Sequence, residues 1–447
     1  MLKHWKTILL LALPSLVAFS TQTITGTVNL IMVGHLGAVV IAIVGVSNII
    51  MYNAFAIFSG LGHTLNYLVA QNYGAGDMKK GIERTYISLY LCAAFGLIIF
   101  LAGLFFAEDI LRFTGGGEKI VEQGTFYLQL RFYAMAFGIV NFAFHGFLRG
   151  IGDTKTSMRI SLLVCGLMIV LTYLLTFGAL GLPNLGLTGA GVSILIGEAV
   201  GLACCLYFYF IRLHPKYGTR SRVRFDWNEA KLILRESFKL GLQEFSMSVS
   251  MYIFTMFVAR LGPEALAANE VALTIMSFGF MPAFAFGTTA TIMVGQEIGK
   301  GNPLGARQVG TETAIMGTLF LFALGLAEFI FAEPLARIFS HDPSVYELTA
   351  RLISVSAFLQ LFDGLYNLYA GGLRGLGDTT FLLRSSFLLC WLLFVPLAFL
   401  NVIVFDFGSM GAWIALYTFL LFYGTAVAIR FYKTDFASVQ MKEAAHG

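Results

Sequence analysis

Four carboxylates in the long apolar stretches of this chain are candidates for chemistry: Asp363, Glu198, Glu270 and Glu244. An ionised group in apolar surroundings is costly to bury, and it is a functional candidate by default. Such a carboxylate can take up a proton, a sodium ion or an organic cation, because each of these neutralises its charge. A carboxylate exposed alternately to two aqueous sides would couple the entry of an ion to the exit of a substrate.

Asp363 is the strongest of the four candidates. It lies 11 residues before Arg374, or roughly 16 Å along a helix, which is close to the middle of a membrane. Ser356, Gln360, Asp363 and Asn367 are spaced four, three and four residues apart, so they share one helix face. That face must contact protein or a wet cavity rather than lipid. The alternative is a structural Asp that locks helices through Gln360 or Asn367, and we favour the functional interpretation.

The other three carboxylates differ in depth and surroundings. Glu198 is as deep as Asp363, but its helix face is otherwise apolar, so a protonated, packed Glu and a proton-carrying Glu are equally supported. Glu270 lies nearer the outer side, and with Thr274 and Ser277 it predicts a polar vestibule. Glu244 is close enough to the inner interface for its side chain to reach water, and we expect no central role for it.

The elements that must position these residues are membrane-spanning helices. Of the 447 residues, 57% are hydrophobic and 12% are charged, about half the charged fraction of a soluble domain. This composition excludes a cytosolic enzyme, a nucleic-acid-binding protein and a disordered chain. A bilayer core needs roughly 20 apolar residues of helix, and a barrel would instead show alternation. Twelve runs qualify, which predicts an all-α membrane protein with spans near residues 7–33, 38–63, 85–106, 123–148, 158–180, 187–212, 236–260, 267–292, 308–331, 344–372, 380–403 and 408–432.

The placement of positive charge predicts the orientation. With the N-terminus inside, all but six of the 29 Lys and Arg residues fall on the inner side, and the six are Arg112, Lys119, Arg131, Arg260, Arg337 and Arg351. An excess of Lys and Arg marks cytoplasmic loops. We therefore predict a multi-pass protein of the plasma membrane with both termini in the cytoplasm. The five Cys and seven His residues show no spacing typical of a metal site, so we expect no cofactor.

An internal repeat divides the chain at a constant offset of 225 residues. The segments 35–37 and 260–262 correspond, and so do Leu148–Thr154 and Leu373–Thr379, which share the pattern LRGxGDT. These turns are too short for a phosphate-binding loop, and we interpret them as structural turns with an anchoring arginine. Two six-helix lobes of the same orientation follow, and substrate sites typically lie at the interface of such repeats. We expect lobes at 1–212 and 236–447, joined by a cytoplasmic linker at 213–235.

The chain resembles the multidrug and toxic compound extrusion (MATE) family of transporters. The stretch Asn29–Gly37 resembles the end of the family's first helix, and Ala267–Arg307 resembles its eighth helix and the loop after it. The LRGxGDT turns and the two six-helix lobes fit as well, so the resemblance covers nearly the whole chain. It implies a V-shaped export antiporter that expels organic cations in exchange for H⁺ or Na⁺.

Some positions depart from the family pattern. Many bacterial members have an Asp where Asn29 stands, and some have an Asn and an Asp where Met168 and Thr172 stand, so the amino-terminal cation site is dismantled here. Helix 8 often has Gln where Glu270 stands, whereas Asp363 matches the family's helix-10 Asp. We therefore predict coupling through Asp363, a possible Na⁺ ligand, with Glu270 as its partner. Gln360, Asn367, Glu198 and Asn29 complete the candidate site.

Other functions are less well supported by the sequence. A flippase for lipid-linked oligosaccharide, found in the same superfamily, would need several cavity-facing Arg or Lys residues, and the middles of the spans have almost none. An integral-membrane enzyme would need His or carboxylate clusters of the HxxxD or HExxH type, which are absent from the sequence. A channel is least favoured. We expect a monomer in the lipid bilayer that binds small organic molecules and no nucleic acid.

Overall fold

The computed structural model describes residues 3–114, 117–339 and 343–443, and these residues form helices with no strand among them. Twelve long helical segments follow the twelve predicted spans, which confirms the fold class. Ten of the described helices are long and apolar enough to cross a membrane. The other two, α4 and α8, are each 33 residues long and carry more charge.

The first six long helices follow one another in the first half of the chain. They are α1 (Trp5–Gly34), α2 (Ala38–Gly74), α3 (Met78–Phe113), α4 (Glu118–Gly150), α5 (Thr154–Phe177) and α6 (Leu187–Tyr207), and α6 continues as a π-helical turn to Arg212. The short helix α7 (His214–Tyr217) follows. Several helices extend well beyond the apolar runs: α2 continues to Gly74 rather than ending near residue 63. The extra turns of α2 carry polar residues that are buried in the protein, among them Thr64, Gln71 and Asn72.

The second six long segments repeat this order. They are α8 (Trp227–Ala259), α9 (Pro263–Gly299), α10 (Pro303–Ile330), α12 (Pro343–Leu376), the span made of α13 (Thr379–Leu389) and α14 (Val395–Phe399) with two π-helical turns, and α15 (Gly408–Lys433). A short amphipathic helix, α11 (Ala332–Phe339), precedes α12. Because α8 begins at Trp227, the last part of the expected linker is helical.

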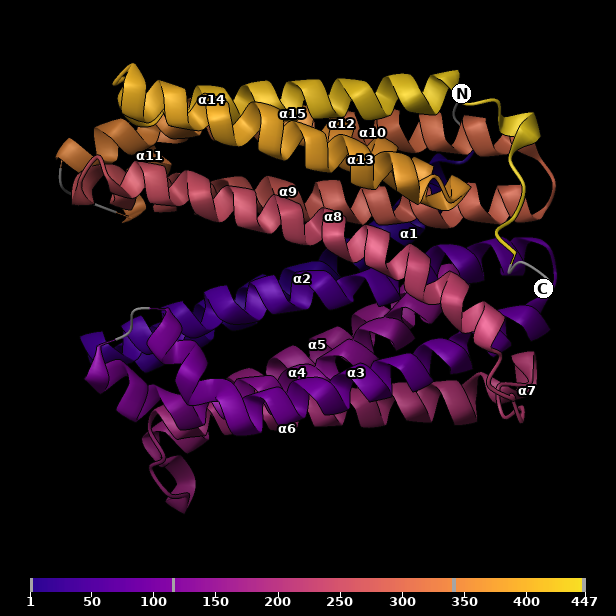
Figure 1. The fold of residues 1–447 in the computed structure, drawn as a ribbon, viewed down its shortest axis with the longest axis horizontal. Coiled ribbons are helices and arrows are strands. Elements are labelled where there is room, and N and C mark those ends of the chain that lie inside the picture. Colours follow the sequence, from indigo (N-terminus) through magenta and orange to yellow (C-terminus); the bar gives the residue numbers. More distant parts are fainter. Residues whose placement is uncertain (1–2, 115–116, 340–342, 444–447) are drawn as a thin grey trace. The chain divides into compact units, whose positions relative to one another are not determined.

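The chain forms two compact units, each of which is a bundle of long helices (Figure 1). The N-terminal unit contains Val17–Gly241, and the C-terminal unit contains Leu242–Lys442 together with the residues up to Leu16. Helices α1 and α8 therefore contribute to both units. Buried ion pairs hold the start of α8 in the N-terminal unit: Glu229 accepts from Arg84 at 3.0 Å and from Lys80 at 2.8 Å.

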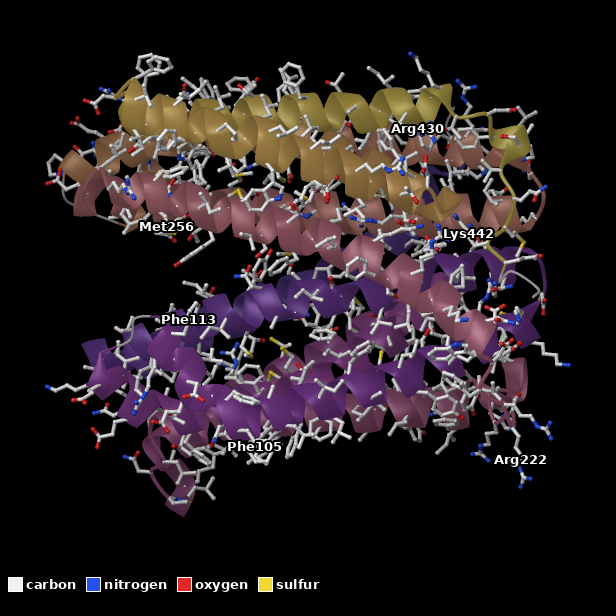
Figure 2. All side chains as sticks on the ribbon, viewed as in Figure 1. Phe105, Phe113, Arg222, Met256, Arg430 and Lys442 are labelled. Carbon is white, nitrogen blue, oxygen red and sulfur yellow. The ribbon has the colours of Figure 1, made fainter. Side chains whose placement is uncertain are left out.

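The outer surface of the bundles is strongly apolar. On α3, the side chains of Phe105 and Phe113 are 66% and 93% exposed, and both project away from their own bundle (Figure 2). Aromatic side chains this exposed are rare on water-soluble proteins but suit a surface that contacts lipid. The surface therefore agrees with the membrane-spanning lengths of the helices.

The two LRGxGDT segments are structural turns, as the sequence predicts. Gly152 and Gly377 adopt left-handed backbone angles of φ 82° and φ 80°, which suit glycine because it has no Cβ. The next residue, Asp153 or Asp378, is the N-cap of the following helix and accepts a hydrogen bond from its first turn. The repeat is therefore preserved in the details of helix capping.

Glycines bring the same two helices together in each unit. A Cβ atom on Gly146 of α4 would lie 2.5 Å from the carbonyl oxygen of Gly62 on α2. At the repeat-related position, a Cβ on Gly371 of α12 would overlap the carbonyl oxygen of Gly287 on α9 even more severely. Small residues of this kind let membrane helices approach backbone to backbone. The crossing α9–α12 fixes the helix that carries Asp363.

Substituting Gly371 by Ala tests this crossing. We expect Gly371→Ala to destabilise the protein by about 1–3 kcal/mol, because the methyl group meets backbone that cannot move aside. Thermal unfolding of the purified protein in detergent measures the effect. The matched control is Gly166→Ala on α5, where a Cβ would have no atom within 4 Å. Equal melting temperatures for the two variants would show that the crossing tolerates extra volume.

Candidate functional site

The polar stripe of α12 faces the interior of the C-terminal unit. Ser356, Gln360, Asp363 and Asn367 are all buried, and Asp363 is only 5% exposed. This arrangement confirms the prediction that the stripe contacts protein rather than lipid. Asp363 therefore stands in an environment where an unneutralised charge is strongly disfavoured.

Asn367 is the direct partner of Asp363. Its side-chain amide donates to the Asp363 carboxylate oxygen Oδ1 at 3.2 Å and to the Asp363 backbone carbonyl at 3.0 Å. This single neutral donor orients the carboxyl group. The described ion pairs give Asp363 no counter-charge, so the group is set up to take its neutralising charge from a proton or another cation.

Glu328 of α10 is a further buried carboxylate, and the sequence reasoning missed it. It is 5% exposed and accepts a hydrogen bond from the side-chain amide of Gln360. Glu328 lies three residues from the end of the predicted span 308–331, and it is not among the four carboxylates singled out from the sequence. Its apolar neighbours on both sides, Ala327 and Phe329, were the available signal.

Gln360 lies in one polar row with the two carboxylates and is bonded to Glu328. It lies three residues before Asp363 on α12, hence roughly 4.5 Å along the helix axis, and it bonds to Glu328 across the helix pair. Gly279 of α9 leaves space for its amide, because a Cβ there would overlap the amide group. The Gln360 carbonyl oxygen is buried and has no partner. The row Glu328–Gln360–Asp363–Asn367, called here the α12 row, thus offers both acidic groups and an unused oxygen acceptor.

Glu270 does not join this row among the described contacts. Its side chain is exposed on α9, and no hydrogen bond or ion pair of the described residues connects its carboxyl group to Asp363. The hydroxyl groups of Thr274 and Ser277 donate to backbone carbonyls of their own helix, at 2.8 and 2.6 Å. Asn269, the residue before Glu270, is buried, and its side-chain oxygen accepts a hydrogen bond from the indole N–H of Trp413 at 2.9 Å. The structure therefore links Glu328, rather than Glu270, to the row.

Glu244 has a charged partner on α12. It forms an ion pair with the buried Arg374 at 3.2 Å. The adjacent Gln243 donates to Tyr366 at 3.0 Å, and the ring of Tyr366 stacks on that of Tyr423 with centroids 4.4 Å apart. Tyr366 lies about one helix turn from Asp363 on α12.

In the N-terminal unit, the candidate residues have separate surroundings. Glu198 of α6 accepts from the side-chain amide of Asn141 on α4 at 2.7 Å, a partner that the sequence did not reveal. Asn29 of α1 is buried, and its side-chain oxygen has no partner. Neither residue forms a described contact with another carboxylate.

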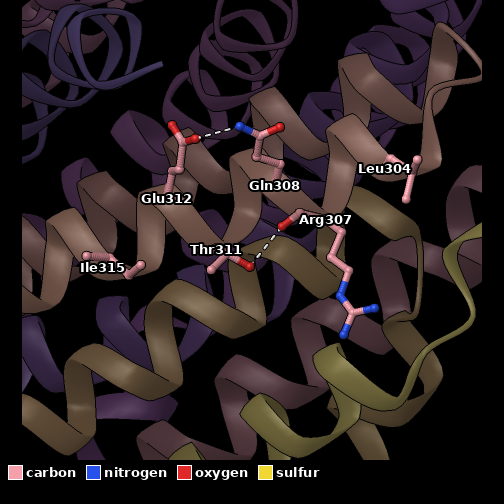
Figure 3. Close-up of a pocket in the computed structure, with 6 residues that line it drawn as sticks. All are labelled: Leu304, Arg307, Gln308, Thr311, Glu312 and Ile315. Carbon is pink, nitrogen blue, oxygen red and sulfur yellow. Dashed lines mark hydrogen bonds between the residues drawn. The ribbon is translucent and has the colours of Figure 1, made fainter. Parts of the chain in front are cut away.

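A hollow of about 340 Å³ lies beside the first turns of α10 (Figure 3). Its lining includes Glu312, which accepts from Gln308 at 2.8 Å and pairs with His4 at 3.3 Å. Glu312 lies 16 residues before Glu328, or roughly 24 Å away along the helix. The hollow is therefore a separate feature from the α12 row. Among the described residues, no group of three or more His, Cys, Asp or Glu could hold a metal ion.

Comparison with solved structures supports the same fold over almost the whole chain. A transporter titled "Crystal structure of MATE in the straight conformation" matches with a TM-score of 0.87 at 21% identity, covering 96% of each chain. An outward-facing multidrug resistance MATE family transporter of the MOP superfamily matches with a TM-score of 0.83 at 21% identity, covering 96% of this chain and 94% of the other.

Sequence comparisons identify relatives of nearly equal length. A probable multidrug resistance protein NorM of Thermotoga maritima is 30% identical over 425 residues, covering 94% of this chain and 90% of the relative. One from Pseudomonas putida is 31% identical over 376 residues, covering 81% and 80%. The family model described as MatE matches twice, at residues 14–174 and 240–400, in keeping with the internal repeat. The chain is a member of the MatE family.

Proposed function

We propose that this protein is a secondary active efflux antiporter that exports organic cations in exchange for H⁺ or Na⁺. The observation that carries the proposal is the burial of the Asp363 carboxylate within a bundle of membrane-spanning helices. Its hydrogen-bond partner is the neutral amide of Asn367, and none of the ion pairs among the described residues includes Asp363. The names of the relatives, probable multidrug resistance proteins, support the export of varied compounds. The protein works as a monomer in the plasma membrane.

The exchange follows from competition for one negative charge. A buried carboxylate is stable when it holds a proton, a sodium ion or an organic cation, and it can hold only one of these at a time. When Asp363 is accessible from outside, the driving ion enters and displaces the substrate. When it is accessible from inside, the ion leaves and the substrate binds. Alternating access therefore converts an ion gradient into export.

The α12 row extends this site toward the end of α10. Glu328 and Gln360 supply a second acidic group and an unpartnered amide oxygen next to the Asp363 position. Oxygen atoms of this kind coordinate Na⁺ in transporters, and hydrogen-bonded acids also relay protons. We propose that Glu328 participates in ion transfer to Asp363, while Glu270, Glu198 and Asn29 have secondary roles.

Asp363→Asn tests the central assignment. The amide keeps the size and hydrogen-bonding shape of the carboxyl group but can neither ionise nor take up a proton. We expect a drop of at least about tenfold in the transport of a fluorescent organic cation by proteoliposomes, under a pH gradient and under a sodium gradient. Glu264→Gln, at an exposed acid in the first turn of α9, is the control. Unchanged ion-driven transport in Asp363→Asn would refute the coupling role.

Glu328→Gln tests the second carboxyl group. The substitution preserves a carbonyl acceptor for Gln360 and removes the charge, so we expect an unchanged melting temperature, slower exchange and a shifted pH dependence of transport. A double-mutant cycle with Gln360→Leu should show a coupling energy of about 1 kcal/mol or more in stability. If Glu328→Gln leaves both the rate and its pH dependence as in the wild type, Glu328 serves only to hold Gln360.

The proposed orientation, with both termini in the cytoplasm, can be measured by cysteine labelling. Four of the five native cysteines are buried, and Cys204 is half-buried, so the background is low. We expect an impermeant maleimide applied to intact cells to label Lys119→Cys, on the less positive side, and to leave Ser221→Cys unlabelled until the cells are opened. Both positions are exposed on the protein surface. The reverse labelling pattern would require the opposite topology.

A further inference from the structure

The two repeated turns carry equivalent arginines with different surroundings. Arg149 of α4 and Arg374 of α12 are related by the offset of 225 residues, and each is only 4% exposed. Both therefore place a permanent positive charge in the interior of a helical bundle. Each guanidinium has one buried nitrogen without a hydrogen-bond partner, Nη2 in Arg149 and Nε in Arg374, so the two residues differ in how their charge is matched.

Arg374 has a counter-charge built into its own unit. Its Nη2 atom lies 3.2 Å from the Glu244 carboxylate. The repeat-related position of Glu244 in α1 is Phe19, since the two residues are also 225 apart. The guanidinium of Arg149 lies over the Phe19 ring, 5.2 Å from its centroid. The phenyl ring thus stands on one side of Arg149 in the place that the carboxylate takes beside Arg374.

Arg149 is only partly compensated by the groups around it. A second ring, Phe142, lies 5.0 Å from the guanidinium, and Nε donates to the backbone carbonyl of His145 at 3.1 Å. Cation–π contacts of this kind offset part of the charge. The Nη2 atom, however, is buried with no hydrogen-bond partner, and none of the ion pairs among the described residues includes Arg149. One donor of a buried cation therefore points at no acceptor.

The neighbouring polar groups do not supply the missing negative charge. The His145 ring is hydrogen-bonded to the Ser157 hydroxyl at 2.6 Å, and both groups are neutral or positive in every protonation state they adopt near neutral pH. Asp153, the nearest acid along the chain, caps α5 through the Thr156 N–H. The turn that follows Arg149 is partly accessible to solvent, because Gly152 and Asp153 are half-buried.

We infer that Arg149 is the binding site of a small monovalent anion, held by Nη2 between the rings of Phe19 and Phe142. The bound anion takes the role in the N-terminal unit that the Glu244 carboxylate has in the C-terminal unit. A halide and a small carboxylate share the required chemistry: one negative charge and an acceptor for the free N–H donor. A bound carboxylate would come from the acid group of a transported compound, and a bound halide would be chloride from solution.

The test uses the purified full chain in detergent and measures its melting temperature. Chloride, acetate or benzoate is titrated from about 1 to 300 mM, with gluconate holding the ionic strength constant. A bound anion stabilises the folded state in a saturable manner, and we expect a rise of a few degrees. A rise with chloride identifies a halide site, and a rise with acetate or benzoate alone identifies a carboxylate site. Equal melting temperatures in all four salts would mean that a water molecule alone satisfies Arg149, and the proposal would be wrong.

A matched pair of variants locates the effect at Arg149. Phe19→Glu provides the counter-charge that Glu244 provides in the other unit, so its melting temperature should no longer depend on the anion. Phe19→Gln introduces a side chain of the same size as Glu but without its charge, so its melting temperature should still depend on the anion. An anion dependence that persists in Phe19→Glu would place the anion elsewhere. If Phe19→Glu does not fold, Arg149→Gln decides: loss of the dependence supports the site, and retention of it overturns the site.

Discussion

A charge inside an apolar bundle must find a counter-charge, a hydrogen-bond partner or a bound ion, and this constraint connects every site in the protein. Arg374 forms an ion pair with Glu244, and Glu229 forms ion pairs with Arg84 and Lys80. The carboxyl group of Asp363 accepts a hydrogen bond from the side-chain amide of Asn367 and has no charged partner among the described ion pairs. Groups that are fully matched hold the helices together, whereas an incompletely matched group is available to exchange its partner. In the proposed mechanism, Asp363 is the group that exchanges its partner.

The duplicated architecture makes the comparison possible. Both units use the same turns with a left-handed glycine and an Asp N-cap, and both use a pair of glycines to bring two helices into backbone contact. On this shared framework the polar residues have diverged. On α12 the C-terminal unit has Gln360, Asp363 and Asn367. The corresponding positions of α4 in the N-terminal unit hold Met135, Gly138 and Phe142. The two units are therefore alike in packing and different in chemistry.

The close helix crossing and the polar row depend on each other. Gly287 and Gly371 let α9 and α12 approach until backbone meets backbone, and Gly279 admits the Gln360 amide between the same two helices. With less space, Gln360 could not reach Glu328, and a buried amide and a buried acid would both lose a partner. Tight packing is thus the condition under which several polar side chains remain buried in one bundle.

The sequence by itself determined the helical spans, the repeat and the polar face of Asp363. These features are local, because the length of an apolar run and a spacing of three or four residues are properties of a single helix. Only the tertiary structure decided which groups are partners. It joined Glu328 to Gln360, Asn141 to Glu198 and Glu244 to Arg374, and it surrounded Arg149 with phenyl rings. Those contacts join helices far apart in the chain, so no single-helix pattern encodes them.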